Sequence, residues 1–359
     1  MTPYELSLLQ AGENLDALMN LDPRGYGVCR ALYPAARALA GKPLSLHAAR
    51  YLLDSVQPGQ FCYVMTGFVL LPHGCPETDG MVSSMLLCRM LTGMCGAVPV
   101  LICPEDCREP ARAMAAAAGL HLYEGEDALE RARTLPASAA FVSFPKERKA
   151  AEEKIRWLLE TARPSAAVAV ELPGANEKGV YHNAVGLDVS ALEARTDLLL
   201  QRLSEAGVPT IAIGDLGNEA GLAALRPHLY QVIPYTAEGE CRCGCGGGIA
   251  AATAADRVLT AVTSDWGCLA MMSAMALLRE QPDWLPDSVL YHRVLDAGCR
   301  AGLIDMGGWQ IPAVDGFGEE LLLPVADLMK ETCRNMLKIR QSGSCSHWFD
   351  GMLQKKFFG

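Results

Sequence analysis

Apolar, β-rich runs that alternate with helical segments constrain the fold of this chain most strongly. Through the middle of the sequence, each run is followed by a stretch with helical periodicity before the next run begins. Continuous apolar strands separated by helices are typical of a mostly parallel sheet with helices on both faces. We expect strands at 61–70, 97–103, 139–144, 165–171, 208–213, 229–234 and 257–263. The expected helices are 79–95, 108–118, 147–162, 190–206, a short one from 218, and 267–280.

Both ends of the chain are predicted to be helical. Residues 1–57 show helical periodicity interrupted by Pro23-Arg24-Gly25 and Gly41-Lys42-Pro43, and the chain after 281 is helical apart from loops near 304–317. No long linker or internal repeat divides the sequence. We therefore predict an α/β fold in a single domain spanning 1–359. It comprises a helical N-terminal extension (1–57), an α/β core (58–280) and a helical C-terminal part (281–359).

Composition limits the classes of partner. Half of the 359 residues are hydrophobic, which allows a substantial core, and the formal net charge of −10 disfavours a nucleic-acid surface. The N-terminus has no basic region typical of a signal peptide. The apolar segment 83–103 contains Arg89, Gly93, Gly96 and Pro99, so we expect a helix and a strand there and not a membrane span. These features predict a cytoplasmic protein without nucleic-acid or membrane partners, and they leave a homo-oligomer open.

The fourteen cysteines are scattered, as expected of reduced thiols in the cytoplasm. Cys241, Cys243 and Cys245 alternate within a glycine-rich stretch, whereas zinc sites usually space their thiolates as Cys-x-x-Cys. A glycine-rich surface loop is the main interpretation of this stretch, and a zinc site is the alternative. Among the seven histidines, His73 and His182 fall in loops that also carry candidate site residues.

Acidic residues with neighbouring glycines follow four of the predicted strands. Because the carboxyl ends of parallel strands share one edge of the sheet, these loops are expected to meet where ligands bind. Neighbouring carboxylates repel one another unless a cation balances their charge. The four loops therefore predict a divalent-metal site that handles a small polar molecule. The four segments are Glu77-Thr78-Asp79-Gly80, Glu171-Leu172-Pro173-Gly174, Gly214-Asp215-Leu216-Gly217-Asn218-Glu219 and Ser264-Asp265-Trp266-Gly267.

Each loop also has a structural interpretation. Glu77 and Asp79 suit Mg²⁺ or Mn²⁺, but Asp79 precedes a helix and would also serve as its N-cap. Asp215 and Glu219 fit direct or water-mediated ligation, with Asn218 as a neutral partner. Phosphate binding by the same loop is disfavoured, because two acids would repel an unscreened phosphate.

Glu171 ends a predicted strand and is a candidate general base if burial raises its pKa. The alternative is a carboxylate that accepts hydrogen bonds from loop amides. Asp265 has a similar alternative as a helix cap. Asp315 lies beside Gly316 in a late loop, where it would close the site from the helical side.

Taken together and in order, these motifs resemble the D-glutamate cyclase-like family. The resemblance spans roughly residues 20 to 340. The matching segments are Thr66-Gly67-Phe68, Glu77 to Gly80, Glu171 to Asn176, Gly179-Val180-Tyr181-His182-Asn183 with Gly186, Ile213 to Glu219, Asp265-Trp266-Gly267 and Val314-Asp315-Gly316.

The resemblance implies conversion of D-glutamate, or a related small acidic amino acid, to 5-oxo-D-proline and water with the help of Mn²⁺ or Mg²⁺. It implies catalytic roles for Glu171 and Glu77. The implied metal ligands are Asp79, Asp215, Glu219 and Asp315. The implied substrate-binding residues are Thr66, Gly67, His73, Asn183, Asn218 and Asp265.

The sequence departs from the family pattern in the lining of the site. The family usually carries arginines where this chain has Leu172 and Ala175, Gly where it has Leu216, and Asn where it has Asp265. An arginine at those positions would hold a substrate carboxylate bidentately. Two further functions therefore stay open, namely a metal-dependent hydrolase of a cyclic amide or phosphate ester and a non-catalytic relative that binds a small ligand.

Overall fold

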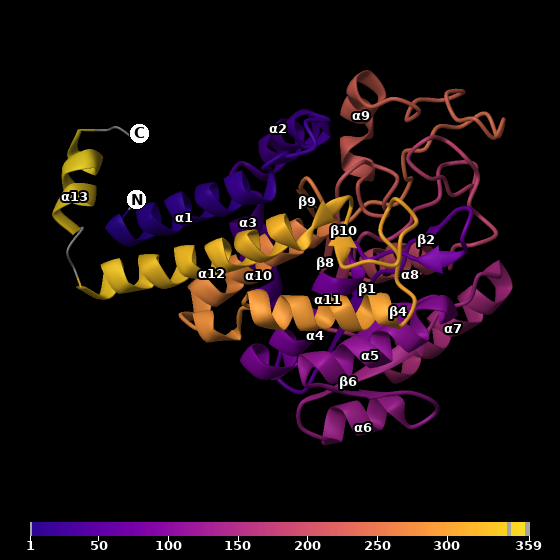
Figure 1. Ribbon diagram of the computed structural model, residues 1–359, viewed down its shortest axis with the longest axis horizontal. Coiled ribbons are helices and arrows are strands. Elements are labelled where there is room, and N and C mark those ends of the chain that lie inside the picture. Colours follow the sequence, from indigo (N-terminus) through magenta and orange to yellow (C-terminus); the bar gives the residue numbers. More distant parts are fainter. Residues whose placement is uncertain (1, 343–345, 356–359) are drawn as a thin grey trace.

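A seven-stranded sheet forms the centre of the molecule (Figure 1). The computed structural model of the protein describes residues 2–342 and 346–355. All neighbouring strands of the sheet run parallel, in the order β5-β6-β4-β1-β7-β8-β9, which confirms the predicted α/β class. The strands are β1 (Phe61–Met65), β4 (Val98–Cys103), β5 (His121–Tyr123), β6 (Ser138–Ser143), β7 (Ala166–Val170), β8 (Thr210–Gly214) and β9 (Arg257–Thr260).

Helices cover the sheet in two groups, which right-handed crossovers place on opposite faces. In the first group α4 packs on α5 and α10, and in the second α7 packs on α8. Their bounds are α4 (Met81–Cys95), α5 (Arg108–Ala118) and α10 (Ser264–Arg279), then α6 (Ala128–Thr134), α7 (Arg148–Thr161) and α8 (Thr196–Glu205). Among the described residues, no helix combines the length and apolarity that crossing a bilayer requires.

The terminal helices add to the first group. α1 and α12 lie side by side, and both contact α10 (Figure 1). This agrees with the predicted helical character of both ends. Their bounds are α1 (Pro3–Met19), α2 (Val28–Ala40) and α3 (Leu44–Ser55) before the sheet, and α11 (Ser288–Arg300), α12 (Glu319–Ser342) and α13 (Ser346–Gln354) after it.

Several predicted elements were wrong in detail. The predicted strand 229–234 belongs to α9 (Arg226–Val232), where a proline in the first turn favours a helix start. The predicted strand 61–70 breaks at Gly67, whose φ is +114°, and continues as β2 (Val69–Leu70), which pairs with β3 (Cys75–Pro76). After β8, helical structure begins only at Ala223, and not at residue 218.

The order of the strands determines where a ligand can bind. β1 lies between β4 and β7, because the chain first builds outward from β1 to β5 and later crosses back to add β7, β8 and β9. At such a switch point the loops after neighbouring strands diverge and leave a crevice at the carboxyl edge of the sheet. A small hairpin of β10 (Ala313–Val314) and β11 (Phe317–Gly318) comes from the C-terminal part.

Gly80 lets two of the edge loops approach closely. Its φ is +73°, and a Cβ there would lie 2.6 Å from the Cβ of Glu171 and 2.7 Å from the Thr66 Oγ1. Any side chain at this position would push the loop after β3 away from the ends of β1 and β7. The glycine therefore places the Glu77–Asp79 loop against Glu171.

Candidate active site

A cavity of about 300 Å³ opens at this carboxyl edge. Its charged and amide lining comes from five separate loops. Apolar side chains at and beside β2, in the loop after β8 and in other loops around the cavity complete the wall. The polar lining residues are Arg24, Glu77, Glu171, Asn183, Asp215, Asn218 and Asp315, and the apolar ones include Phe68, Val69, Leu70 and Leu216.

Glu171 occupies a strained position at the end of β7. Its φ is +45°, in a region that non-glycine residues rarely adopt, and its carboxylate is buried. The Ser264 hydroxyl donates a 2.6 Å hydrogen bond to Oε2. This contact holds one carboxylate oxygen in place at the cavity wall.

Asp79 is held by the first turn of α10. Its Oδ1 accepts the backbone N–H of Asp265 at 2.7 Å, and its Oδ2 accepts that of Ser264 at 3.0 Å. The positive end of the helix dipole favours a carboxylate at this place. Asp79 therefore caps α10, which lies in another part of the chain. The alternative prediction, in which Asp79 is the N-cap of the helix α4 that follows it, is wrong.

Asp265 points away from the cavity. Its Oδ1 accepts the backbone N–H of Ser83 in the first turn of α4 at 2.8 Å, and Oδ2 accepts the Tyr291 hydroxyl. Burial raises the pKa of Asp265 to about 6. The predicted substrate contact of Asp265 stays a prediction, and the contacts in this structure are those of a helix cap.

Glu219 organises the loop after β8. Its Oε1 accepts the N–H groups of Asp215 at 2.7 Å and Leu216 at 2.8 Å, and its Oε2 accepts that of Gly217 at 2.5 Å. These bonds fold the loop around a fully buried carboxylate and leave the Asp215 side chain at the cavity. Glu219 is thus a positioning residue whose role as a metal ligand stays a prediction.

Two groups of carboxylates are close enough to share an ion. Asp79, Asp215 and Asp315 each offer one oxygen within 4.8 Å of the others, and the same holds for Glu171, Asp215 and Glu219. Asp215 belongs to both groups. Three or more hard oxygen donors at this separation suit Mg²⁺ or Mn²⁺.

Burial and mutual repulsion act on the acids together. Burial, followed by the charges of neighbouring carboxylates, raises the pKa of Glu77, Asp79, Glu171 and Asp215 well above the ordinary range. Such groups give up their protons less readily than exposed carboxyls, and a nearby cation that balances their charge reverses this effect. The donor set therefore fits a divalent metal ion.

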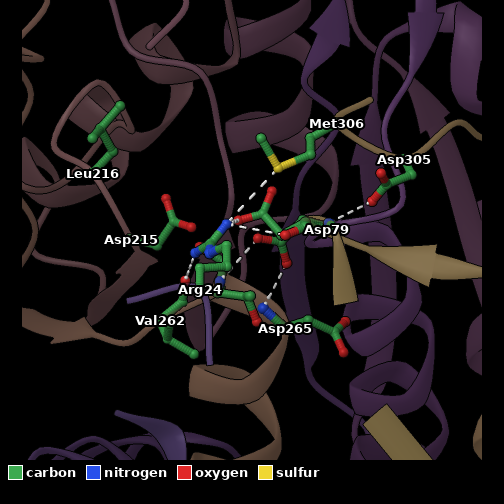
Figure 2. Close-up of polar contacts among 12 residues, drawn as sticks. Arg24, Asp79, Asp215, Leu216, Val262, Asp265, Asp305 and Met306 are labelled. Carbon is green, nitrogen blue, oxygen red and sulfur yellow. Dashed lines mark hydrogen bonds and ion pairs between the residues drawn. The ribbon is translucent and has the colours of Figure 1, made fainter. Parts of the chain in front are cut away.

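Arg24, which lies in the predicted break between two N-terminal helices, enters this cluster. Its Nη1 donates to Asp315 Oδ2 at 2.7 Å, and its Nη2 donates to the carbonyl of Val262 (Figure 2). Burial by itself lowers the pKa of Arg24, but the negative charges of Asp315, Asp215 and Asp79 outweigh this effect, and the pKa is raised. No local pattern relates this residue to an acid 291 positions later.

The other predicted substrate contacts divide into two groups. Asn183 and Asn218 line the cavity, whereas Thr66, Gly67 and His73 do not. The Thr66 hydroxyl is buried without a partner among the described residues, and His73 is exposed.

A comparison with protein-family models decides the family. The model for D-glutamate cyclase-like proteins, C-terminal, matches residues 15–323. The chain belongs to the D-glutamate cyclase-like family. This confirms the resemblance seen in the motifs, and the matched range contains every predicted site residue as well as Arg24. No curated protein matches the chain.

Proposed function

We propose that this member of the D-glutamate cyclase-like family is a metal-dependent lyase that converts D-glutamate, or a closely related acidic amino acid, to 5-oxo-D-proline and water. One observation carries the proposal, namely a small cavity in which Glu77, Glu171, Asp215 and Asp315 surround the cationic Arg24. Its volume of about 300 Å³ is at the lower end for small-molecule sites, as a substrate of this size requires.

Asp79, Asp215 and Asp315 are the proposed metal ligands. Their oxygens lie within 4.8 Å of one another. Burial, followed by the negative charge of neighbouring carboxylates, raises the pKa of Asp79 and of Asp215, and a cation would balance that charge. A bound Mn²⁺ or Mg²⁺ ion would polarise the γ-carboxyl group of the substrate and stabilise its oxyanion.

Glu171 is the proposed base. The substrate ammonium must lose a proton before its nitrogen can attack the γ-carbon, and a carboxylate with a raised pKa accepts that proton more readily. Glu77 lines the same cavity and would pass a proton to the departing oxygen. In total the ammonium gives up two protons, one C–N bond forms, and one γ-oxygen leaves with both protons as water.

Arg24 is the proposed partner of the substrate α-carboxylate. It is the cationic side chain among the lining residues, and it would take the place of the motif arginines that this chain lacks at Leu172 and Ala175. Binding both ends of the substrate folds it toward ring closure, which lowers the entropic part of the barrier.

The test is turnover of the purified full chain. The protein is dialysed free of Mn²⁺ and Mg²⁺, one metal is restored, and D- and L-glutamate are followed by chiral chromatography. We expect metal-dependent 5-oxo-D-proline from the D-enantiomer, and a loss of about 10²- to 10⁴-fold in kcat for Glu171→Gln. The exposed Glu153→Gln serves as the matched control. Absence of product from both enantiomers with metal restored would overturn the proposed substrate.

Hydrolysis of a cyclic amide is the second candidate. Phe68, Leu70 and Leu216 give the cavity an apolar wall that suits an uncharged ring. The same acids would then act in the reverse direction, with water as the nucleophile. Release of glutamate from 5-oxoproline, without measurable formation of the ring, would favour this direction.

A further inference from the structure

Four donor groups, three thiols and one imidazole, lie close together and do not line the cavity. His182 belongs to the loop after β7, whereas Cys241, Cys243 and Cys245 belong to the segment between α9 and β9. One ligand atom of each lies within 4.8 Å of the others. The acidic groups of the cavity contribute none of these atoms.

The separations match the edges of a coordination tetrahedron. The Cys241 sulfur lies 3.6 Å from that of Cys243 and 3.4 Å from that of Cys245. The His182 Nε2 lies 3.1 Å from the Cys243 sulfur and 3.8 Å from the Cys245 sulfur. Around a tetrahedral zinc ion the S–S edge is roughly 3.8 Å and the S–N edge roughly 3.6 Å, given the usual bond lengths. All three cysteines are free thiols, with sulfurs too far apart for a disulfide.

A metal ion would add a further link to the segment that carries the cysteines. Residues 233–256 form no helix or strand, and glycine occupies positions 244 and 246–248 between and after the ligands. Long loops without secondary structure are uncommon in compact domains unless something holds them. Backbone hydrogen bonds hold parts of it, such as Arg242 N–H to the Gly186 carbonyl at 2.8 Å and Ala251 N–H to the Gly217 carbonyl at 2.9 Å, but the loop contributes little apolar core.

We propose that His182, Cys241, Cys243 and Cys245 bind one structural zinc ion. Three thiolates and one imidazole favour zinc over the hard cations that suit the acidic cavity. Since the protein supplies all four ligands, the site is closed to substrate and its role is structural.

The zinc site would fix one wall of the cavity. The Asn218 side-chain amide donates to the carbonyl of His182 at 3.0 Å, and Asn183, the next residue, lines the cavity. The Asn176 side-chain amide also joins the two loops, by donating to the Gly248 carbonyl at 2.7 Å. The ion would therefore hold the loop after β7 and the loop before β9 in one arrangement. This inference goes beyond the proposed reaction and does not depend on it.

The metal content of the purified chain tests the proposal. We expect one zinc ion per chain by mass spectrometry of the metal after gel filtration. Replacement by Co²⁺ should give thiolate charge-transfer bands and the intense visible bands of tetrahedral cobalt. A chain that is isolated without zinc and gives no such spectrum on addition of Co²⁺ overturns the proposal, as does a native disulfide within 241–245.

Variants separate this site from the acidic cavity. Cys243→Ser and Cys245→Ser should lose the zinc and the cobalt spectrum, whereas Cys75→Ser, a free cysteine outside the cluster, should keep both. Asp215→Asn should keep the zinc as well. If Cys243→Ser does not fold, the cobalt spectrum of the unaltered chain still decides the question. Zinc that persists in the doubly substituted Cys243→Ser/Cys245→Ser chain contradicts the assignment.

Discussion

Backbone strain singles out two acids of the cavity. Glu171 and Asp315 have φ values of +45° and +57°. A non-glycine residue in this region costs of order 1–3 kcal/mol, and it persists only where its surroundings fix it. The Glu171 N–H donates to the Ile213 carbonyl at 3.1 Å, and Arg24 binds both the carbonyl and the side chain of Asp315. At this scale the chain holds two carboxylates in unfavourable backbone conformations at the site where we expect the chemistry.

Arg24 gives the prediction that belongs to the single residue. For Arg24→Gln we expect KM for D-glutamate to rise about 10- to 100-fold, because a charged hydrogen bond contributes about 1.5–3 kcal/mol. Arg24→Lys should recover part of this, since an ammonium keeps the charge but loses the bidentate geometry. Steady-state kinetics with the exposed Arg148→Gln as control makes the measurement. An unchanged KM would mean that Arg24 balances the charge of Asp315 and does not bind the substrate.

At the scale of elements, two helices cap each other through the residues of the site. Asp79 accepts from the first turn of α10, while Asp265, itself in that turn, accepts from the first turn of α4. Tyr291 of α11 joins through its hydroxyl. These bonds fix α4, α10 and α11 relative to one another. They explain an acid at position 265 without any contact to substrate.

Replacing Asp265 by alanine tests this role. The variant should lower the free energy of unfolding by about 2–4 kcal/mol, because it removes a cap and leaves a buried donor without a partner. Thr2→Ala is the matched control, as it removes an exposed cap at the start of α1 and should cost about 1 kcal/mol. Urea unfolding gives both values. If stability is unchanged while substrate binding is lost, Asp265 contacts the substrate directly, as the family resemblance implied.

The sequence predicted those parts of the site that depend on the parallel sheet alone. The loops with Glu171 and Asp215 converge because consecutive parallel strands end at the same edge. Arg24 and the Asp265–Tyr291 pair could not be predicted, because packing of the terminal helices brings them in over long sequence distances. The cysteine spacing favoured a surface loop because it is not Cys-x-x-Cys, and the proposed fourth ligand, His182, lies 61 residues from Cys243.

At the scale of the whole molecule, we propose that the helical ends fold with the α/β core as one domain. α1 and α12 both pack on α10, whose first turn holds Asp79. The segment after α1 carries Arg24, and Asp315 lies between β10 and β11 in the hairpin before α12. The segment that follows α1 and the hairpin that precedes α12 therefore meet at the acidic cavity, and the stability of the whole fold should depend on the charge held there.

The pH dependence of stability follows from these charges. A carboxyl whose pKa is higher in the folded protein than in the unfolded chain makes the folded state bind more protons between the two values. The stabilisation that such a carboxyl gives to the folded state is complete below its pKa in the unfolded chain, which is about 4. This stabilisation is lost as the pH rises through its pKa in the folded protein, which is about 6 for Asp265. Without Mn²⁺ and Mg²⁺, we therefore expect the Tm to fall from about pH 5 to pH 7. It should fall less in Asp215→Asn, which lacks one of the carboxyls whose pKa is raised.

Mn²⁺ at 100-fold above its Kd should add about 2.7 kcal/mol to the free energy of unfolding, which raises the Tm by a few °C. The rise should be larger at pH 7 than at pH 5, because protons compete for the same oxygens, and it should be nearly absent in Asp215→Asn. Calorimetric scans of both proteins at the two pH values make the comparison. An equal effect of Mn²⁺ on the variant would mean that the ion binds away from Asp215.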